Sequence, residues 1–249
     1  MCPNIYIASL KINLYALCQL LGYVVISVYM VHEITKIQYI RRDHVLLVIF
    51  LGFFVQYFGG SILPYLYKWI YFHKVPDWRS FYRAGRYFHS VFLSYLAYLL
   101  LMCAWFRWPT KKVLDIFAIA VLIMSPIGRI GCFFQGCCVG KPALPPWGIS
   151  FPVYQGAYLI PTQLYMLGIE MFLCFLLIQI NKKKKYDGQT FWIAVFLYSF
   201  YRFLIEFLRS NPIFIFGLTH AQVFSIFTFC VAGGILNRYK SQKSIPVRD

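Results

Sequence analysis

The stretch INLYALCQLLGYVVISVYMVH, residues 12–32, contains no Asp, Glu, Lys or Arg. It is long enough to cross a bilayer as a helix, which takes about 20 mostly apolar residues. Its apolar residues do not alternate with polar ones, as they would in a strand of a membrane barrel. The stretch therefore predicts a membrane-spanning helix. Because no small-residue cleavage site follows it, we expect this helix to remain in the protein as its own insertion signal.

Apolar runs of the same kind recur along the chain, which is 60% hydrophobic and only 13% charged. A soluble domain is about 45–50% apolar, so lipid is the expected solvent. Seven spans are predicted, at residues 12–32, 44–65, 88–106, 113–127, 163–180, 190–208 and 221–237. The sequence thus predicts an all-α integral membrane protein with a single transmembrane domain over residues 1–249. We expect an ordered outer loop, residues 128–162, between the fourth and fifth helices, and a cytoplasmic tail over residues 238–249.

The basic side chains set the expected orientation. The net charge of +16 comes from Lys and Arg that lie mostly between the apolar runs, where they attract anionic lipid head groups. This placement argues against a nucleic-acid partner. Fourteen of the 24 Lys and Arg fall on the side that holds the C-terminus, nine fall on the other side, and Arg202 lies inside the sixth run. The positive-inside rule then places the C-terminus in the cytoplasm and the N-terminus outside an inner or plasma membrane.

One face of the sixth apolar run is polar. The residues Tyr198, Arg202, Glu206 and Arg209 follow one another at intervals of four, four and three positions, so they form a single stripe on a helix. A charged side chain inside a span costs at least ~2.5–3.5 kcal/mol, which makes such residues candidates for a functional site. One interpretation is a structural ion pair between Arg202 and Glu206, with Arg209 extending to the membrane surface.

A second interpretation adds Arg129, which follows the fourth run between Gly128 and Gly131. Two guanidinium groups suit a phosphate, because each can donate a planar pair of hydrogen bonds. Glycines at these positions and at Gly140 permit a close approach of the backbone to a ligand. Irregular backbone at membrane depth survives only where it lines a cavity in the protein. We therefore expect the outer loop to cover an anion-binding pocket at the outer face.

Other polar residues stand at the predicted outer ends of the spans. They are Tyr15 in the first helix, His89 in the third, Gln163 and Tyr165 in the fifth and Gln222 in the seventh. A histidine at the start of a span is often an interfacial hydrogen-bonding residue. It is also the natural proton acceptor near neutral pH, because an imidazole titrates at ~6.5. A base beside a phosphate site would indicate a transfer reaction.

Three cysteines in the outer loop, Cys132, Cys137 and Cys138, have the spacing C-x4-C-C. Zinc sites prefer C-x2-C pairs that are joined by a second pair or by histidines. We therefore expect no metal here, and we interpret these residues as packing thiols or as partners in a disulfide of an oxidising compartment. The cysteines within the spans are expected to be core residues.

Several blocks of the sequence resemble the prolipoprotein diacylglyceryl transferase family. The most specific block is GRIGCFFQGCCVGKP at residues 128–142, which is followed by PWGISFP at 146–152, PTQLY at 161–165, YSFYRFLIEFLR at 198–209 and LTHAQVFSI at 218–226. Upstream, LKINLYALCQLLG at residues 10–22 and AGRYFHS at 84–90 resemble the family's first-helix block and histidine block. The cysteines at 132 and 137 stand where the family more often has an asparagine and a carboxylate.

The resemblance implies a seven-span enzyme that moves a diacylglyceryl group from phosphatidylglycerol to the lipobox cysteine of a prolipoprotein. Its catalytic residues would be His89, Arg129, Arg202 and Glu206. Its substrate-binding residues would be Tyr15, Gly128, Gly131, Gly140, Gln163, Tyr165, Tyr198 and Arg209. The expected partners are phosphatidylglycerol, the prolipoprotein signal peptide and membrane lipid, with no cofactor. A lipid transferase with another acceptor, or a non-catalytic lipid or anion transporter, remains an alternative, although we find no internal repeat of the kind transporters often carry.

Overall fold

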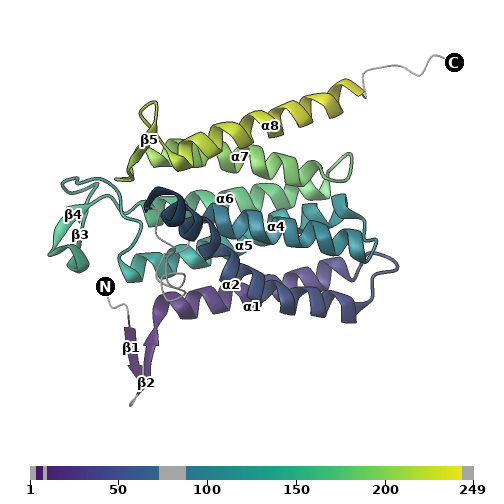
Figure 1. Cartoon of the computed structure of the whole chain (residues 1–249), viewed down its shortest axis with the longest axis horizontal. Coiled ribbons are helices and arrows are strands. Elements are labelled where there is room, and N and C mark those ends of the chain that lie inside the picture. Colours follow the sequence, from purple (N-terminus) through teal and green to yellow (C-terminus); the bar gives the residue numbers. More distant parts are fainter. Residues whose placement is uncertain (1–3, 8–9, 73–87, 243–249) are drawn as a thin grey trace. The chain divides into compact units, whose positions relative to one another are not determined.

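The computed structural model describes residues 4–7, 10–72 and 88–242, and its described part contains seven α-helices (Figure 1). The helices are α1 Leu14–Ile34, α2 Arg42–Phe72, α4 Phe88–Trp105, α5 Thr110–Gln135, α6 Thr162–Lys182, α7 Gln189–Glu206 and α8 His220–Gln242. Three antiparallel hairpins accompany them: β1 Asn4–Ile7 with β2 Leu10–Asn13, β3 Ile149–Phe151 with β4 Ala157–Leu159, and β5 Ile213–Ile215 with β6 Leu218–Thr219. A short 3-10 helix, η1 Pro152–Tyr154, separates β3 from β4.

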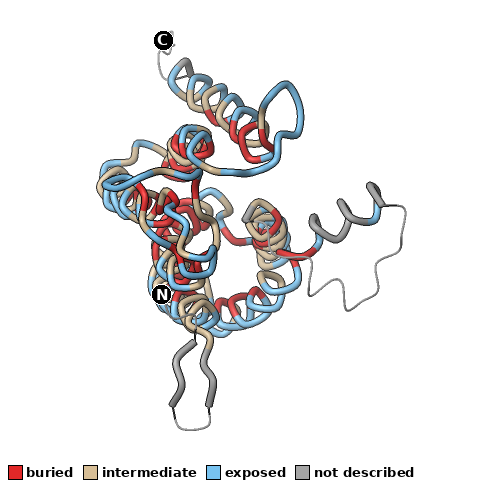
Figure 2. The backbone as a smooth tube through the Cα atoms, turned by 90° about the vertical axis from the view of Figure 1, so that its left-hand side faces the viewer, coloured by how far each residue is buried: buried red, intermediate tan, exposed pale blue. Residues whose placement is uncertain are grey.

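The predicted all-α membrane fold is confirmed, because one helix lies at each predicted span. Within the described residues, five helices are long and apolar enough to cross a membrane: Leu14–Ile34, Arg42–Ile62, Thr110–Gln135, Thr162–Lys182 and His220–Lys240. Helix α4 is also apolar but shorter, and α7 contains the charged residues Arg202 and Glu206. Large apolar side chains such as Phe50, Phe172 and Phe227 are more than 60% exposed, as expected for side chains that face lipid. Buried residues follow the inner sides of the helices (Figure 2).

The chain forms two compact units, each of which is described by itself. Unit 1 comprises Met1–Tyr29 and Leu114–Asp249, and unit 2 comprises Met30–Val113. In unit 1, helix α7 packs against both α6 and α8 (Figure 1). In unit 2, helices α2 and α4 pack against each other. The single transmembrane domain expected over residues 1–249 stays a prediction.

Helices α2 and α4 of unit 2 are antiparallel and approach closely at two glycines. A Cβ at Gly59 would lie 2.5 Å from the Cβ of Ser94, and a Cβ at Gly52 would lie 2.9 Å from the Tyr95 hydroxyl. The Tyr98 hydroxyl donates a hydrogen bond of 2.8 Å to the carbonyl of Val48. Because glycine has no side chain, the two helix backbones can approach closely at these positions. The Tyr98 hydroxyl finds its acceptor across the contact.

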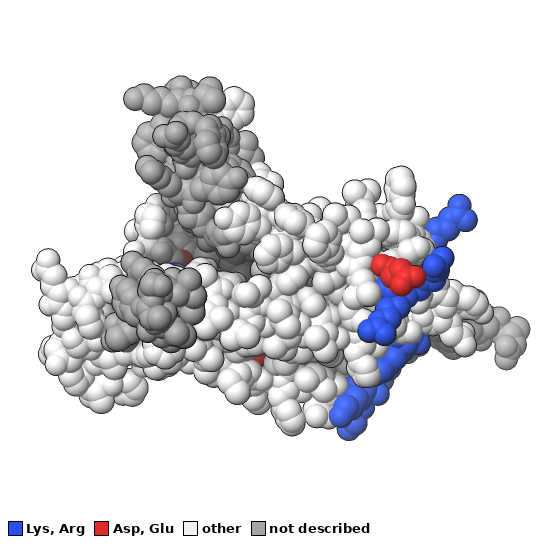
Figure 3. Space-filling view, turned by 90° about the horizontal axis from the view of Figure 1, so that it is seen from below, with Lys and Arg blue, Asp and Glu red and all other residues white. Residues whose placement is uncertain are grey.

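The antiparallel packing brings the basic connections of unit 2 to one end. His44 at the start of α2 stacks on Phe106 just after α4, with the ring centroids 4.5 Å apart. The connections at this end carry exposed cations, namely Lys36, Arg41, Arg42, Arg107, Lys111 and Lys112. Figure 3 shows Lys and Arg side chains at one end of the helices and a surface of neutral side chains beyond them. This is the distribution that the positive-inside rule describes.

Helix α5 extends to Gln135, past the predicted end of the fourth span at residue 127. Gly128, Arg129 and Gly131 are therefore helical and do not belong to a loop. The glycines are tolerated because they face α1: a Cβ at Gly131 would lie 3.0 Å from the Cβ of Cys18. Close packing of two helices offsets the intrinsic cost of glycine in a helix, about 1 kcal/mol.

The connection between α5 and α6 is ordered and is attached to the end of α7. The Gly140 amide donates to the Ile160 carbonyl at 2.8 Å, and the Lys141 amide donates to the Leu208 carbonyl at 2.8 Å. A Cβ at Gly140 would lie only 2.5 Å from the oxygen of Leu208. Glycine at this position is what lets the connection lie against the end of α7.

The opposite end of α7 is held by Asp115 of α5. This buried carboxylate accepts hydrogen bonds of 2.9 Å from the amides of Gly188 and Phe191 and is 2.7 Å from Lys184 Nζ. Gly188 is the N-cap of α7 and has no side chain with which to satisfy these amides. Asp115 of α5 therefore caps the N-terminus of α7, and a negative charge is favourable at a helix N-terminus.

Candidate functional site

The buried charges of α7 form an ion pair in which both carboxylate oxygens have partners. Arg202 Nη1 lies 2.6 Å from Glu206 Oε2, and the two side chains are 9% and 0% exposed. The other carboxylate oxygen, Oε1, accepts hydrogen bonds from the Asn211 amide and from the Thr219 hydroxyl. The pairing predicted between Arg202 and Glu206 is thus present, and Glu206 fixes the position of the arginine.

A second buried ion pair joins α5 to α6. Arg129 Nη2 lies 3.3 Å from Glu170 Oε1, and Glu170 is completely buried. The Tyr201 hydroxyl of α7 donates to the same oxygen. Glu170 was not among the site residues predicted from the sequence. Its signal was a carboxylate in the middle of a predicted span, seven residues after Gln163 and hence on the same helical face.

Arg209, after α7, is the cation with the weakest partner of the three. Its Nε lies 3.8 Å from Glu206 Oε2, which is beyond hydrogen-bond distance, although only 10% of its side chain is exposed. Among the described residues this Nε has no hydrogen-bond partner. Its Nη1 donates a long hydrogen bond of 4.0 Å to the Met166 sulfur. A buried guanidinium with an unused donor is suited to binding an anion.

The three arginines belong to one electrostatic neighbourhood in unit 1. Tyr198 interacts with the charges of Arg129, Arg202 and Glu170, and Glu206 interacts with Arg202 and Arg209. Within this cluster, three guanidinium groups face two carboxylates, so one positive charge is left over. An uncompensated charge in an apolar bundle is costly, and an anionic ligand would neutralise it.

Gln163 and Thr162, at the start of α6, hold the turn formed by Cys137 and Cys138. Gln163 Nε2 donates to the Cys137 carbonyl at 2.6 Å, and the Thr162 hydroxyl donates to the Cys138 carbonyl at 2.6 Å. Gln163 Oε1 is buried and has no hydrogen-bond partner in the described part of the chain. The amide predicted to bind substrate therefore has one group committed to the turn and one acceptor still available.

The remaining predicted site residues divide between the two units. Tyr15 of α1 and Tyr165 of α6 are half-buried in unit 1. His89 is half-buried near the start of α4, in unit 2. Gly128, Gly131 and Gly140 have the packing surroundings described above. Their roles toward a substrate stay predictions, as does the catalytic role of His89.

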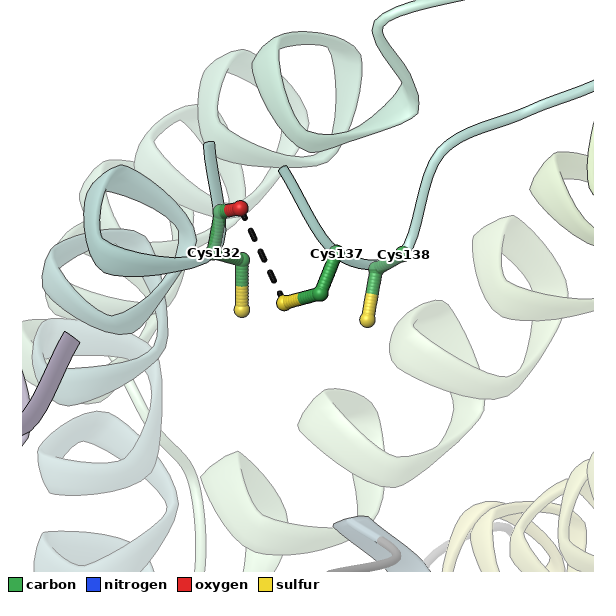
Figure 4. A group of neighbouring side chains, drawn as sticks. All are labelled: Cys132, Cys137 and Cys138. Carbon is green, nitrogen blue, oxygen red and sulfur yellow. Dashed lines mark hydrogen bonds between the residues drawn. The ribbon is translucent and has the colours of Figure 1, made fainter. Parts of the chain in front are cut away.

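The three loop cysteines converge. Cys132 lies in the last turn of α5, Cys137 and Cys138 follow the helix, and the three Sγ atoms lie within 4.8 Å of one another. Figure 4 shows the sulfur atoms side by side, with the Cys137 thiol donating to the Cys132 carbonyl. Hydrogen bonds with the thiols of Cys132 and Cys137, together with the charges of Arg209 and Arg129, lower the pKa of the Cys138 thiol. The charges of two arginines of the cluster therefore act on the Cys138 thiol.

The order of these residues along the chain agrees with one known family. The family model described as "Prolipoprotein diacylglyceryl transferase" matches residues 4–238. The chain belongs to the prolipoprotein diacylglyceryl transferase family. This confirms the resemblance inferred from the sequence blocks around Arg129 and Arg202.

Individual members of the family align over most or over part of the chain. The phosphatidylglycerol-prolipoprotein diacylglyceryl transferase of Wolbachia pipientis subsp. Culex pipiens is 29% identical over 236 residues, 88% of each chain. That of Finegoldia magna is 28% identical over 230 residues, 90% of this chain and 88% of the relative. The transferase of Clostridium tetani is 33% identical over 149 residues, 57% of this chain. Here the chain spans only 60% of the relative's length.

Proposed function

We propose that this protein transfers a diacylglyceryl group from phosphatidylglycerol to the thiol of a lipobox cysteine in a prolipoprotein, releasing glycerol phosphate. The observation that carries the proposal is the buried cluster of three arginines against two carboxylates. A phosphodiester is an anion whose oxygens accept hydrogen bonds from guanidinium groups. The names of the relatives support the same donor and acceptor.

The cluster suits the donor phosphate by geometry as well as by charge. Glu206 and Glu170 each hold one arginine, so Arg202 and Arg129 are oriented before a ligand arrives. Arg209 contributes a donor that no described carboxylate satisfies. Donors that are fixed in advance stabilise charge as it develops and need no reorganisation during the reaction.

The reaction is a displacement at the glyceryl carbon that bears the phosphate. The acceptor thiol loses its proton, because the thiolate is the competent nucleophile. The resemblance of residues 84–90 to the family's histidine block suggests His89 as the proton acceptor. The sulfur then forms a bond to the glyceryl carbon while the bond from that carbon to the phosphate oxygen breaks. The electron pair leaves with glycerol phosphate, whose growing negative charge Arg129 and Arg202 stabilise.

The proposed setting is a bacterial inner membrane, with the N-terminus outside, the C-terminus in the cytoplasm and the site near the outer face. The support is the excess of Lys and Arg in the connections on the C-terminal side. A tag at Asp249 should therefore be protected in intact cells, whereas a cysteine introduced at Gln155 should react with an impermeant maleimide. Reversed accessibility would contradict this orientation.

The transfer itself can be tested with purified full-length protein in detergent. The protein is incubated with phosphatidylglycerol and a lipobox peptide, and the peptide mass is measured. We expect an increase that corresponds to one diacylglyceryl group, no increase with a serine-for-cysteine peptide, and none with Arg129→Gln. A protein that binds phosphatidylglycerol without modifying the peptide would favour the non-catalytic alternative.

A further inference from the structure

The spacing of Cys132 and Cys137 is explained by the way α5 ends. The Cys137 amide donates to the Cys132 carbonyl and the Gly136 amide donates to the Phe133 carbonyl, both at 3.1 Å. Gly136 has a left-handed φ of 70°. This is a Schellman motif, in which the residue after the glycine contacts the residue five positions earlier. That contact is usually between apolar side chains, but here it joins two thiols.

Cys138 completes the group at a backbone cost. Its φ of 62° lies in the left-handed region, which is unfavourable for a residue with a Cβ by about 1–2 kcal/mol. The turn is held by the hydrogen bonds from Thr162 and Gln163 to the carbonyls of Cys138 and Cys137. A strained conformation that is fixed from another helix is typical of a functional position. In this conformation the third sulfur lies beside the other two (Figure 4), and all three are within 4.8 Å of one another.

The distances suit a shared metal ion. The three Sγ atoms lie within 4.8 Å of one another, whereas three sulfurs bound to one tetrahedral zinc at ~2.3 Å would be about 3.8 Å apart. Small side-chain rotations close this difference. We propose that Cys132, Cys137 and Cys138 bind one thiophilic divalent cation of the zinc class through three thiolates.

The surrounding charges favour such a complex. Three thiolates and one divalent cation together carry a single negative charge. Arg209 and Arg129 both interact with Cys138, so this charge has cationic neighbours in the same unit. The sequence argued against a metal because the C-x4-C-C spacing lacks a C-x2-C pair. The Schellman motif supplies by backbone geometry the convergence that a C-x2-C turn provides elsewhere.

The fourth coordination position is open to a ligand. Among the described residues, the group contains no fourth His, Cys, Asp or Glu. Three protein ligands with an open position characterise catalytic zinc sites, whereas structural sites have four. We assign this position to the acceptor cysteine, because a thiol that coordinates the metal is deprotonated. This assignment rests on the proposed function. Its proton is released to a base or to water, the sulfur attacks the glyceryl carbon, glycerol phosphate leaves with the bonding pair, and the thioether dissociates from the metal.

Metal binding can be measured without any transfer. Full-length protein, reduced and stripped with a chelator, is dialysed against zinc and analysed by elemental mass spectrometry. We expect one zinc per chain in the wild type and in the control Cys230→Ala, whose thiol is exposed on α8. We expect at least a hundredfold weaker binding in Cys137→Ala and in Cys138→Ala. Equal zinc content in all four proteins, or a disulfide between two of the three cysteines in place of zinc, would overturn the site.

The open position is tested with cobalt in place of zinc. Cobalt bound by three thiolates gives an intense charge-transfer band and visible d–d bands. A lipobox peptide should shift the d–d bands, and its serine analogue should leave them unchanged. Identical spectra with both peptides would overturn the assignment of the acceptor to the metal. Because neither measurement requires phosphatidylglycerol, zinc binding without transfer would refute the proposed function and leave the metal site standing.

Discussion

Replacing Arg202 by glutamine separates a phosphate-binding arginine from a purely structural one. Arg202 and Glu206 are buried and 2.6 Å apart, and removing one partner of a buried pair costs about 3–5 kcal/mol. Glu206 keeps hydrogen bonds from Asn211 and Thr219, so we expect the lower end, about 3 kcal/mol. For a chain of this size, that corresponds to a fall in Tm of about 6–12 °C.

The double variant Arg202→Gln with Glu206→Gln decides between the two roles. Removing both charges relieves the unpaired carboxylate, so most of the lost thermal stability should return. Transfer should not return, because the leaving phosphate still lacks one charged donor, which is worth about 10²–10³-fold in rate. The assay is thermal unfolding in detergent alongside peptide modification. Restored transfer in the double variant would refute the phosphate-binding role.

A matched control is available at an exposed ion pair. Arg41 and Asp43 lie 3.2 Å apart with side chains that are 71% and 77% exposed. Exposed pairs contribute little to stability, so neutralising both residues should leave Tm and transfer unchanged. A similar loss in the control and in the Arg202 variants would show that the effect is one of charge removal in general.

Three further changes test the surroundings of the cluster. Glu170→Gln should lower kcat about tenfold, a loss of ~1.4 kcal/mol, without raising KM for phosphatidylglycerol. The reason is that Arg129 loses its fixed position but keeps its charge. A rise in KM alone would contradict this. Gly140→Ala should lower the free energy of unfolding by about 1–3 kcal/mol, since the new Cβ would meet a carbonyl oxygen at 2.5 Å. The control Gly168→Ala should not destabilise the protein, because nothing lies within 4 Å of its Cβ position. Asp115→Asn should lower Tm by removing the charge that caps α7, at a cost of about 1–3 kcal/mol. The transfer rate per folded molecule should stay unchanged. An unaltered Tm would contradict the capping role of Asp115.

The sequence predicted the helices and one half of the site. Hydropathy is enough to locate spans, because each must bury its own backbone in lipid. The pair Arg202 and Glu206 was visible because both residues lie one helical turn apart on the same element. The pair Arg129 and Glu170 joins two elements and therefore depends on packing that local periodicity does not encode. The predicted loop position of Arg129 was wrong because glycine and proline indicate a loop, whereas here Gly128 and Gly131 let α5 pack closely against α1.

The convergence of the three cysteines also could not be predicted from the sequence. Their spacing along the chain does not fit a known metal motif, so the sequence favoured packing thiols or a disulfide. The structure adds a helix end that places Cys137 over Cys132 and a left-handed turn that brings in Cys138. The helix end depends on Gly136, whose position directly before the cysteine pair was the available signal, whereas the turn at Cys138 is held by Thr162 and Gln163 of α6.

In the proposed reaction, one displacement breaks the bond between the glyceryl carbon and the phosphate oxygen. The most direct test uses phosphatidylglycerol that carries deuterium in the diacylglyceryl backbone and carbon-13 in the head-group glycerol, with purified protein and a lipobox peptide. We expect deuterium in a thioether on the cysteine and carbon-13 in free glycerol phosphate, in equal amounts. Transfer of an acyl chain alone, or of a product that retains phosphorus on the peptide, would contradict it.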